Sequence, residues 1–142
     1  AISLGDDPDV LIAQLKERFR EAEISDGGED FQHTLDLVIA LIEAPEKPHQ
    51  LPLDVQGAAF QERVWQALTR VPAGSTASYA EVARDIGAPT AARAVARACA
   101  TNAVAVAIPC HRVVRSDGAV SGYRWGSQRK TAILKREKQA KD

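Results

Sequence analysis

The sequence predicts a chain of two lobes, a small α/β lobe followed by a mainly helical domain. Three observations predict this class: apolar residues at helical spacing in several segments, a proline-rich stretch near residue 50, and two short helices joined by a glycine turn. Apolar residues make up 45% and charged residues 26% of the 142, which is typical of a folded globular protein. No apolar run approaches the roughly 18 residues of a membrane span, so no membrane contact is predicted.

The first lobe is predicted over residues 1–52. AISL at the start of the chain is typical of the end of a strand. A helix follows, capped by Asp7, with an apolar face that begins at Leu11 and recurs every four residues. A second helix begins near Phe31 and ends before Pro45. The stretch PEKPHQLPLDVQG then forms the linker between the lobes.

The mainly helical domain is predicted over residues 53–142. Its first helix carries Phe60, Val64 and Leu68 on one stripe. Further along, VAVAI at residues 104–108 is typical of a buried strand, and RSDGAVSGYRWG contains a tight turn and a hairpin-like, wing-like loop. SQRKTAILKREKQA is predicted to form the last helix, with a basic outer face.

Two short helices within this domain resemble a helix-turn-helix. Ser78 and Glu81 form a capping box that opens the first, and Thr90 is predicted to cap the second, AARAVARACAT. The second helix is rich in alanine and places Arg93 and Arg97 four residues apart on one side. Such a pair suits the approach to a phosphate backbone or groove, but two surface arginines on an ordinary helix are an equally open interpretation.

The net charge of −1 conceals an asymmetry between the two halves of the chain. Residues 1–59 carry thirteen acidic and four basic side chains, a net charge of −9, and residues 60–142 carry a net charge of +8. A polyanion, most commonly nucleic acid, is one partner that suits the basic half. A solvated basic surface without a partner is the other interpretation.

The stretch AIPCHRVVRSDG places Cys110 directly before His111 and Arg112. A cysteine becomes a nucleophile as its thiolate, and its usual pKa of about 8.5 must be lowered by a neighbouring base, cation or helix N-terminus. A histidine that acts as the base needs an orienting carboxylate, for which Glu137 and Asp117 are the downstream candidates. A buried structural cysteine remains the alternative interpretation.

The cysteine count favours reduced thiols in a cytosolic setting, because two cysteines do not make a disulfide scaffold. Cys99 is expected to be a core residue that packs the alanine-rich helix. A zinc site built from Cys99, Cys110 and His111 is disfavoured, since the spacing matches no usual pattern and a fourth ligand is not evident. A papain-like protease is disfavoured as well, because no histidine follows His111.

The segment IPCHRVV, preceded by Asn102 and followed by SGYRWG, resembles the active-site motif of the methylated-DNA–protein-cysteine methyltransferases, or O6-alkylguanine-DNA alkyltransferases. SGYRWG and FQERVWQALTRVPAGSTASYAEVA are most similar to the C-terminal domain of Ada-type bacterial members, and the similarity covers residues 51–138. The resemblance implies direct repair of double-stranded DNA by irreversible, stoichiometric transfer of the methyl group of O6-methylguanine, or O4-methylthymine, to Cys110. It implies a monomer in the bacterial cytoplasm, associated with the nucleoid, that uses no metal and no cofactor.

The resemblance also implies catalytic roles. Cys110 would attack the alkyl carbon, and His111 would take the thiol proton through a bound water molecule. Glu137 would orient His111, as the carboxylate of a catalytic triad does. Asn102 would brace the turn that carries the cysteine, and Tyr79 would donate its hydroxyl proton toward the leaving base.

Further roles concern the binding of the base and of DNA. Tyr123 would line the base pocket, the backbone near Val113 would read the exocyclic amine, and Lys130 matches a pocket position of the family. An alkylated base inside a duplex must be flipped out to be reached, and Arg93 would fill the gap from the minor groove. The predicted DNA contacts are Arg93, Arg97, Arg112 and Arg115.

In the family, the first lobe contains a small ribonuclease-H-like sheet and the second is a winged helix-turn-helix domain. The strands expected ahead of AISL are missing, so we expect a truncated first lobe. Ada-type members also carry an upstream zinc-binding regulatory domain, and the resemblance implies such a domain as one possible partner in the full-length protein. The alternative function is a DNA-binding damage sensor or regulatory module without transfer. Sensors of that kind lack the acceptor cysteine, which is present here at Cys110.

Overall fold

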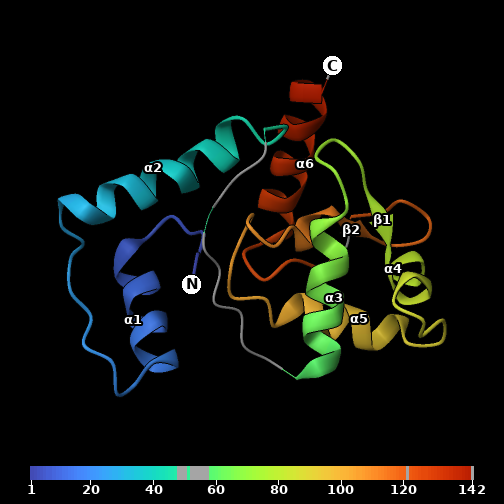
Figure 1. Cartoon of the computed structure of the whole chain (residues 1–142), viewed down its shortest axis with the longest axis horizontal. Helices are drawn as coiled ribbons and strands as arrows, with labels where there is room; N and C mark the ends of the chain where they lie inside the picture. Colours follow the sequence, from blue (N-terminus) through green and yellow to red (C-terminus); the bar gives the residue numbers. More distant parts are fainter. Residues whose placement is uncertain (48–50, 52–57, 121, 142) are drawn as a thin grey trace.

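The computed structural model describes residues 1–47, 51, 58–120 and 122–141 and shows an α-rich fold with a small two-stranded sheet (Figure 1). The predicted lobe boundary between residues 52 and 53, and most of the linker of residues 45–57 around it, lie outside the described residues. The elements are α1 (Pro8–Arg18), α2 (Glu29–Glu43), α3 (Ala59–Thr69), β1 (Ala77–Ser78), α4 (Tyr79–Asp85), α5 (Ala92–Ala100), the 3₁₀-helix η1 (Cys110–Arg112), β2 (Val113–Val114) and α6 (Ser127–Lys141).

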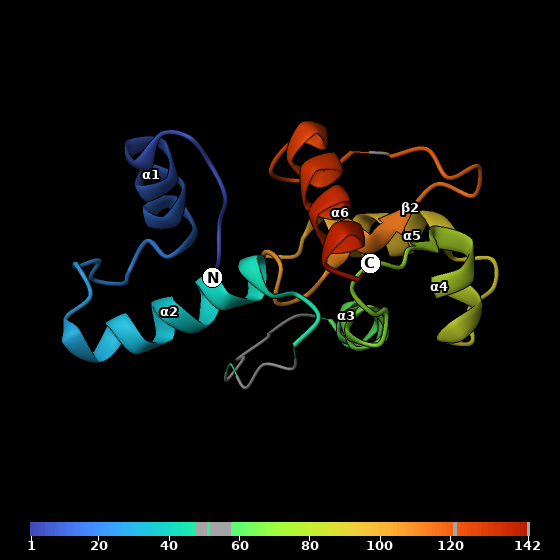
Figure 2. The same cartoon turned by 90° about the horizontal axis from the view of Figure 1, so that it is seen from above.

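Helices α1 and α2 lie to one side of the other helices in both views (Figures 1 and 2). The predicted cap of α1 is confirmed, because the Asp7 carboxylate accepts a hydrogen bond from the backbone N–H of Asp9 at 2.9 Å. AISL contributes one isolated parallel bridge, between Ile2 and Val104, which is the connection described between the start of the chain and the segment that precedes Cys110.

The hydrophobic core lies between α3, α4 and α5. The predicted stripe on α3 is confirmed: Val64 and Leu68 are buried and Phe60 is half-buried. The buried indole N–H of Trp65 donates to the carbonyl of Ala98 at 3.0 Å. Because α5 is rich in alanine, its backbone can approach α3 closely enough for this bond.

The turn between α4 and α5 differs from the prediction at one cap. The capping box at the start of α4 is confirmed, since the N–H of Glu81 donates to the Ser78 hydroxyl at 3.0 Å and the N–H of Ser78 donates to the Glu81 carboxylate at 2.9 Å. The prediction that Thr90 caps α5 is wrong. The N-cap residue is Ala91, whose N–H bonds to the carbonyl of Ala88, so that Thr90 lies inside a backbone turn instead.

The prediction of a buried strand over residues 104–108 is wrong in conformation and right in burial. Val104 forms the single bridge to Ile2, but the N–H of Ala107 bonds to the carbonyl of Ala105 and the N–H of Ile108 to that of Val104. The segment therefore curls into consecutive turns, and Val106 adopts a φ of 59°, a left-handed conformation that β-branched residues rarely occupy. The side-chain amide of Asn102 donates hydrogen bonds to the carbonyls of Val104 and Ile108, and these bonds hold the strained backbone in place.

The turn within RSDGAV is confirmed. The N–H of Gly118 bonds to the carbonyl of Arg115, the Asp117 carboxylate accepts from the N–H of Ala119, and Gly118 has a φ of 81° that glycine tolerates best. Just before this turn, β2 pairs with β1 in parallel, with Ala77 opposite Val113. Within the described ranges, no helix is both long and apolar enough to cross a membrane.

Changing Ser78 to Ala is expected to lower the free energy of unfolding by about 1 kcal/mol, because the first turn of α4 loses its side-chain acceptor. The matched control is Thr90→Ala, which is expected to change it by less than about 0.5 kcal/mol because the Thr90 side chain does not cap α5. Urea denaturation of the two variants measures both values. Equal losses in the two variants would contradict the cap assignment.

Candidate active site

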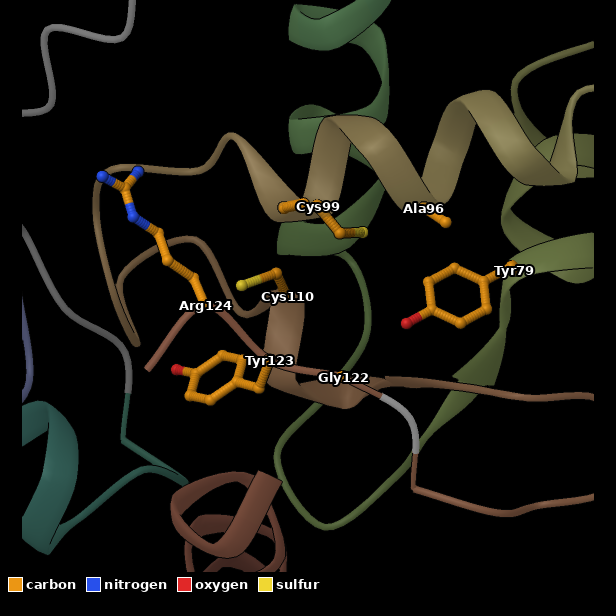
Figure 3. A pocket seen from close by; sticks show the side chains of 8 residues that line it. Tyr79, Ala96, Cys99, Cys110, Gly122, Tyr123 and Arg124 are labelled. Atoms are coloured by element: carbon orange, nitrogen blue, oxygen red, sulfur yellow. The ribbon is translucent and has the colours of Figure 1, made fainter. Parts of the chain in front are cut away.

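A pocket of about 450 Å³ opens between α5, η1, the start of α4 and residues 122–124 (Figure 3). Its volume lies in the range of sites that hold small molecules or single bases, about 300–1,000 Å³. Cys110 stands in its wall although only 3% of the residue is exposed. The lining residues are Tyr79, Ala96, Cys99, Ala100, Cys110, Gly122, Tyr123 and Arg124.

Asn102 organises the turn that ends at Cys110. Its side-chain amide donates to the carbonyls of Ile108 at 2.9 Å and Val104 at 3.3 Å, and its side-chain oxygen accepts from the N–H of Val104 at 2.9 Å. The same amide contacts the sulfur of Cys110 at 3.2 Å. Asn102 is almost fully buried, so these bonds replace the water that its polar atoms would otherwise need. They fix both the strained turn and the cysteine.

Behind the pocket, a carboxylate on α6 joins the two residues that follow Cys110. The Nε2 atom of His111 lies 2.6 Å from Oε1 of Glu137. Arg112 donates to the same carboxylate through Nε at 3.0 Å and Nη2 at 2.9 Å, and through Nη1 to the carbonyl of Val71 at 2.7 Å. All three side chains of this cluster are buried or nearly so.

The pKa values define the resting state of the cluster. Burial alone would raise the pKa of Glu137, but hydrogen bonds from His111 and Arg112 and the charge of Arg112 prevail and lower it to about 2. Burial lowers the pKa of His111 against the opposing effect of Glu137. At neutral pH the imidazole is therefore neutral and the carboxylate ionised. Since Nε2 donates its proton to Glu137, Nδ1 is the unprotonated nitrogen of this tautomer.

Cys110 rests as a thiol. Burial raises its pKa, while the Asn102 amide, the charge of Lys130 and the charge of Arg124 oppose that shift. The Nδ1 atom of His111 is buried and has no hydrogen-bond partner among the described residues. This nitrogen can accept a proton, which is what a buried thiol needs in order to react.

The structure gives Arg112 other partners than the predicted DNA phosphate. Its side chain is 12% exposed, and its three donor groups bond to Glu137 and Val71. Arg112 therefore holds the carboxylate that holds His111, and a DNA contact at Arg112 stays a prediction. Motif position alone did not reveal this, since Glu137 lies far along the chain.

Lys130 and Tyr79 form a second pair at the pocket. Only 1% of Lys130 is exposed, and its ammonium nitrogen lies 5.9 Å from the centroid of the Tyr79 ring, within reach of a cation–π interaction. Burial lowers the pKa of Lys130, and the nearby thiols of Cys110 and Cys99 oppose this. A cation at this place stabilises negative charge on either Tyr79 or Cys110.

Tyr123 packs edge-to-face against Trp125, with ring centroids 5.2 Å apart at an interplanar angle of 69°. Its hydroxyl is buried and has no hydrogen-bond partner among the described residues. Burial raises the pKa of Tyr123, so the phenol is neutral. Trp125 thus fixes the ring that forms one wall of the pocket.

The other predicted residues lie outside the pocket wall. Val113 is fully buried in β2 and is not among the residues that line the pocket. Arg93 and Arg97 are exposed on α5, and Arg115 is exposed in the turn after β2. The structure thus gathers Cys110 with the buried cluster and keeps these three arginines on the surface.

Several lining residues were not predicted. Ala96, Cys99 and Ala100 lie at i, i+3 and i+4 of α5 and therefore share one face, a spacing that the sequence already contains. Cys99 is a core residue, as predicted, but it lines the pocket as well, and burial raises its pKa to about 12. For Arg124 the sequence gives no signal beyond its place next to Tyr123.

Replacing Glu137 with Gln is expected to lower the free energy of unfolding at neutral pH by about 3 kcal/mol, because an unfolded glutamate has a pKa of about 4.3. A pKa that folding lowers contributes stability above the unfolded value, and this contribution is lost as the pH falls toward about 2. Urea denaturation at neutral pH and near pH 3 tests this, since the gap between wild type and variant should shrink by about half. A gap that stays constant would exclude the ion pair as its source.

Comparisons with known proteins find relatives over most of this chain. Residues 59–139 match the family described as 6-O-methylguanine DNA methyltransferase, DNA binding domain. The chain is 51% identical over 137 residues to the bifunctional transcriptional activator/DNA repair enzyme Ada of Escherichia coli, an alignment that covers 96% of this chain and 39% of Ada. It is 51% identical over 86 residues to the methylated-DNA–protein-cysteine methyltransferase of Mycobacterium tuberculosis, covering 61% of this chain and 52% of that protein. The chain thus spans about half, or less, of the length of these relatives.

Solved structures show the same architecture. The crystal structure of Mycobacterium tuberculosis OGT in complex with DNA superposes with a TM-score of 0.73 at 43% identity and covers 78% of this chain and 68% of that chain. The O6-methylguanine-DNA methyltransferase of the archaeon Pyrococcus kodakaraensis has the same fold, with a TM-score of 0.71 at 24% identity over 95% of this chain and 83% of that one. By the match over residues 59–139, the chain belongs to the O6-methylguanine DNA methyltransferase family.

Proposed function

We propose that this chain repairs alkylated DNA directly, by moving the methyl group of O6-methylguanine or O4-methylthymine to its own Cys110. The observation that carries the proposal is a thiol in a pocket wall, held by Asn102 at 3.2 Å and followed in the chain by a neutral histidine on a buried carboxylate. The family and the names of the relatives support the same reaction. The transfer requires no cofactor, since the acceptor is part of the chain.

The reaction is a single in-line displacement. The thiol proton of Cys110 passes to Nδ1 of His111, directly or through one water molecule, and Glu137 stabilises the imidazolium that forms. A bond forms between the sulfur and the methyl carbon as the bond from that carbon to the O6 atom breaks, and the electron pair of that bond leaves with the base. A proton from Tyr79 neutralises the leaving base. The thioether is stable, so each chain reacts once.

The charged surface of α5 suits double-stranded DNA. Arg93 and Arg97 are exposed beside small residues that permit close approach to a minor groove, and Arg115 extends the basic surface. Arg93 fills the gap that a flipped base leaves, and phosphate contacts provide affinity without sequence preference. The DNA complex formed by the related Mycobacterium tuberculosis protein supports this partner.

The finer fold assignment belongs to the same proposal. Helices α4 and α5 with the turn between them form a helix-turn-helix, and residues 115–119 form its wing. This domain spans residues 53–142 and follows a lobe of residues 1–52, which we take as a truncated form of the ribonuclease-H-like lobe of the family. The bridge between Ile2 and Val104 supports a strand at the start of that lobe.

Mixing the protein with duplex DNA that contains one O6-methylguanine is expected to add one methyl mass per chain. Trypsin releases both cysteines in one peptide, residues 98–112, so fragment ions must place the methyl group on Cys110 and not on Cys99. Cys110→Ala is expected to abolish transfer and keep DNA binding. Transfer that persists in Cys110→Ala would overturn the proposal, and wild-type protein that binds this DNA without gaining mass would identify a damage-sensing module instead.

The two kinds of arginine are expected to respond differently. Arg97→Gln should reduce the slope of log Kd against log salt concentration by about 1 and leave the rate of transfer from bound DNA unchanged. Arg112→Gln should leave the salt slope unchanged and slow transfer at least about tenfold, because His111 loses its fixed carboxylate. Fluorescence anisotropy and single-turnover rates measure the two quantities. A reduced salt slope in Arg112→Gln would identify that residue as a phosphate contact.

A further inference from the structure

Arg124 is a fixed cation in the wall of the pocket. Its Nη1 atom donates to the carbonyl of Asn102 at 3.0 Å, and its guanidinium carbon lies 5.6 Å from the centroid of the Trp125 ring. These two contacts hold the side chain between the turn that carries Cys110 and an aromatic ring. Of the lining residues that the structure describes, Arg124 alone carries a full charge.

The guanidinium of Arg124 lies on one side of Cys110 in the pocket wall. In Figure 3, Cys110 lies between Tyr79 on one side and the guanidinium of Arg124 on the other. Both residues line the same pocket, and the charge of Arg124 partly offsets the rise that burial causes in the pKa of Cys110. The hydrogen bonds described for the guanidinium use Nη1 alone, which leaves Nε and Nη2 as donors at an exposed side chain.

We propose that Arg124 is a specificity-determining residue that favours O6-alkyl groups bearing a carboxylate, with the carboxymethyl group as the simplest case. The inference rests on the proposed function and extends its substrate class. In an in-line displacement, the sulfur, the reacting carbon and the O6 atom lie on one line, so any substituent on that carbon projects sideways. A carboxylate on that carbon therefore lies off the line of attack, against the pocket wall, where Arg124 is the charged residue among the lining residues that the structure describes.

The charge also affects the reaction itself. A carboxylate next to the reacting carbon repels the negative charge that develops on the sulfur of Cys110, and a neighbouring cation offsets this repulsion. The sulfur forms a bond to the methylene carbon as the bond from that carbon to O6 breaks. The thiol proton passes to His111, and the guanine receives a proton as it leaves. The product is S-carboxymethylcysteine at position 110, with its carboxylate paired to Arg124.

The test compares two lesions of the same shape, O6-carboxymethylguanine and its neutral amide, O6-carbamoylmethylguanine, each placed in the same duplex. Single-turnover rates give the ratio of acid to amide for every variant. Arg124→Gln is expected to lower this ratio about tenfold or more, because the charge-assisted pair with the carboxylate is lost. Arg124→Lys keeps a cation and should retain most of the ratio. Arg124→Glu reverses the charge and should lower the ratio further than Arg124→Gln does. Any general effect of losing the bond to Asn102 cancels in the ratio.

The matched control is Arg18→Gln, an exposed arginine on α1, which should leave the ratio unchanged. An acid-to-amide ratio that is the same in wild type, Arg124→Gln and Arg124→Glu would overturn the inference. So would wild-type protein that transfers methyl but no carboxymethyl group. Methyl transfer from O6-methylguanine, measured in the same variants, separates the two proposals. If methyl transfer proceeds while the acid-to-amide ratio is the same in all variants, only the role of Arg124 fails. If the wild-type protein transfers no methyl group, both proposals fail.

Discussion

The buried carboxylate of Glu137 is the interaction on which the site depends. It receives donors from His111 at 2.6 Å and from Arg112 at 2.9 Å, so one side chain of α6 fixes two consecutive residues of η1. Removing one partner of such a buried group leaves an unpaired charge, which costs far more than the pair contributes when it is intact. The cluster therefore ties the C-terminal helix to the segment that carries Cys110. Stability and the proposed chemistry depend on the same three side chains.

Asn102 supplies the second constraint, and it explains why the segment before Cys110 is not a strand. A run of apolar residues over 104–108 has the composition of a buried strand, but composition specifies burial and not backbone direction. The amide of Asn102 bonds to two carbonyls of this segment and draws it into a turn. Because those bonds come from Asn102, which lies outside the apolar run, the pattern within the run does not predict them.

The sequence predicted what local chemistry determines. The caps at Asp7 and Ser78 and the apolar stripe of α3 follow from spacing within one turn or one helix, and the structure confirms them. The family motif predicted Cys110, His111 and Glu137 as a group, and Glu137 does contact His111, the residue that follows Cys110 in the chain. The role of Arg112 and the pocket face of α5 depend on which elements meet in space, and spacing in the sequence does not determine that. The prediction that Thr90 caps α5 was wrong for a local reason, because a backbone turn moves the start of the helix by one residue, to the N-cap Ala91.

The raised pKa of Cys110 explains how the thiol of a proposed single-use acceptor avoids reaction with other electrophiles before an alkylated base is bound. An exposed thiolate reacts with any electrophile, whereas a thiol that is 3% exposed and protonated at neutral pH does not. In the proposed reaction, the nucleophile forms only when a substrate fills the pocket and His111 accepts the thiol proton. Asn102, Lys130 and Arg124 each partly offset the effect of burial, so the charge can develop on the sulfur during the displacement without being present before it. Burial protects the thiol, and the groups that face it favour the charge that the proposed reaction requires.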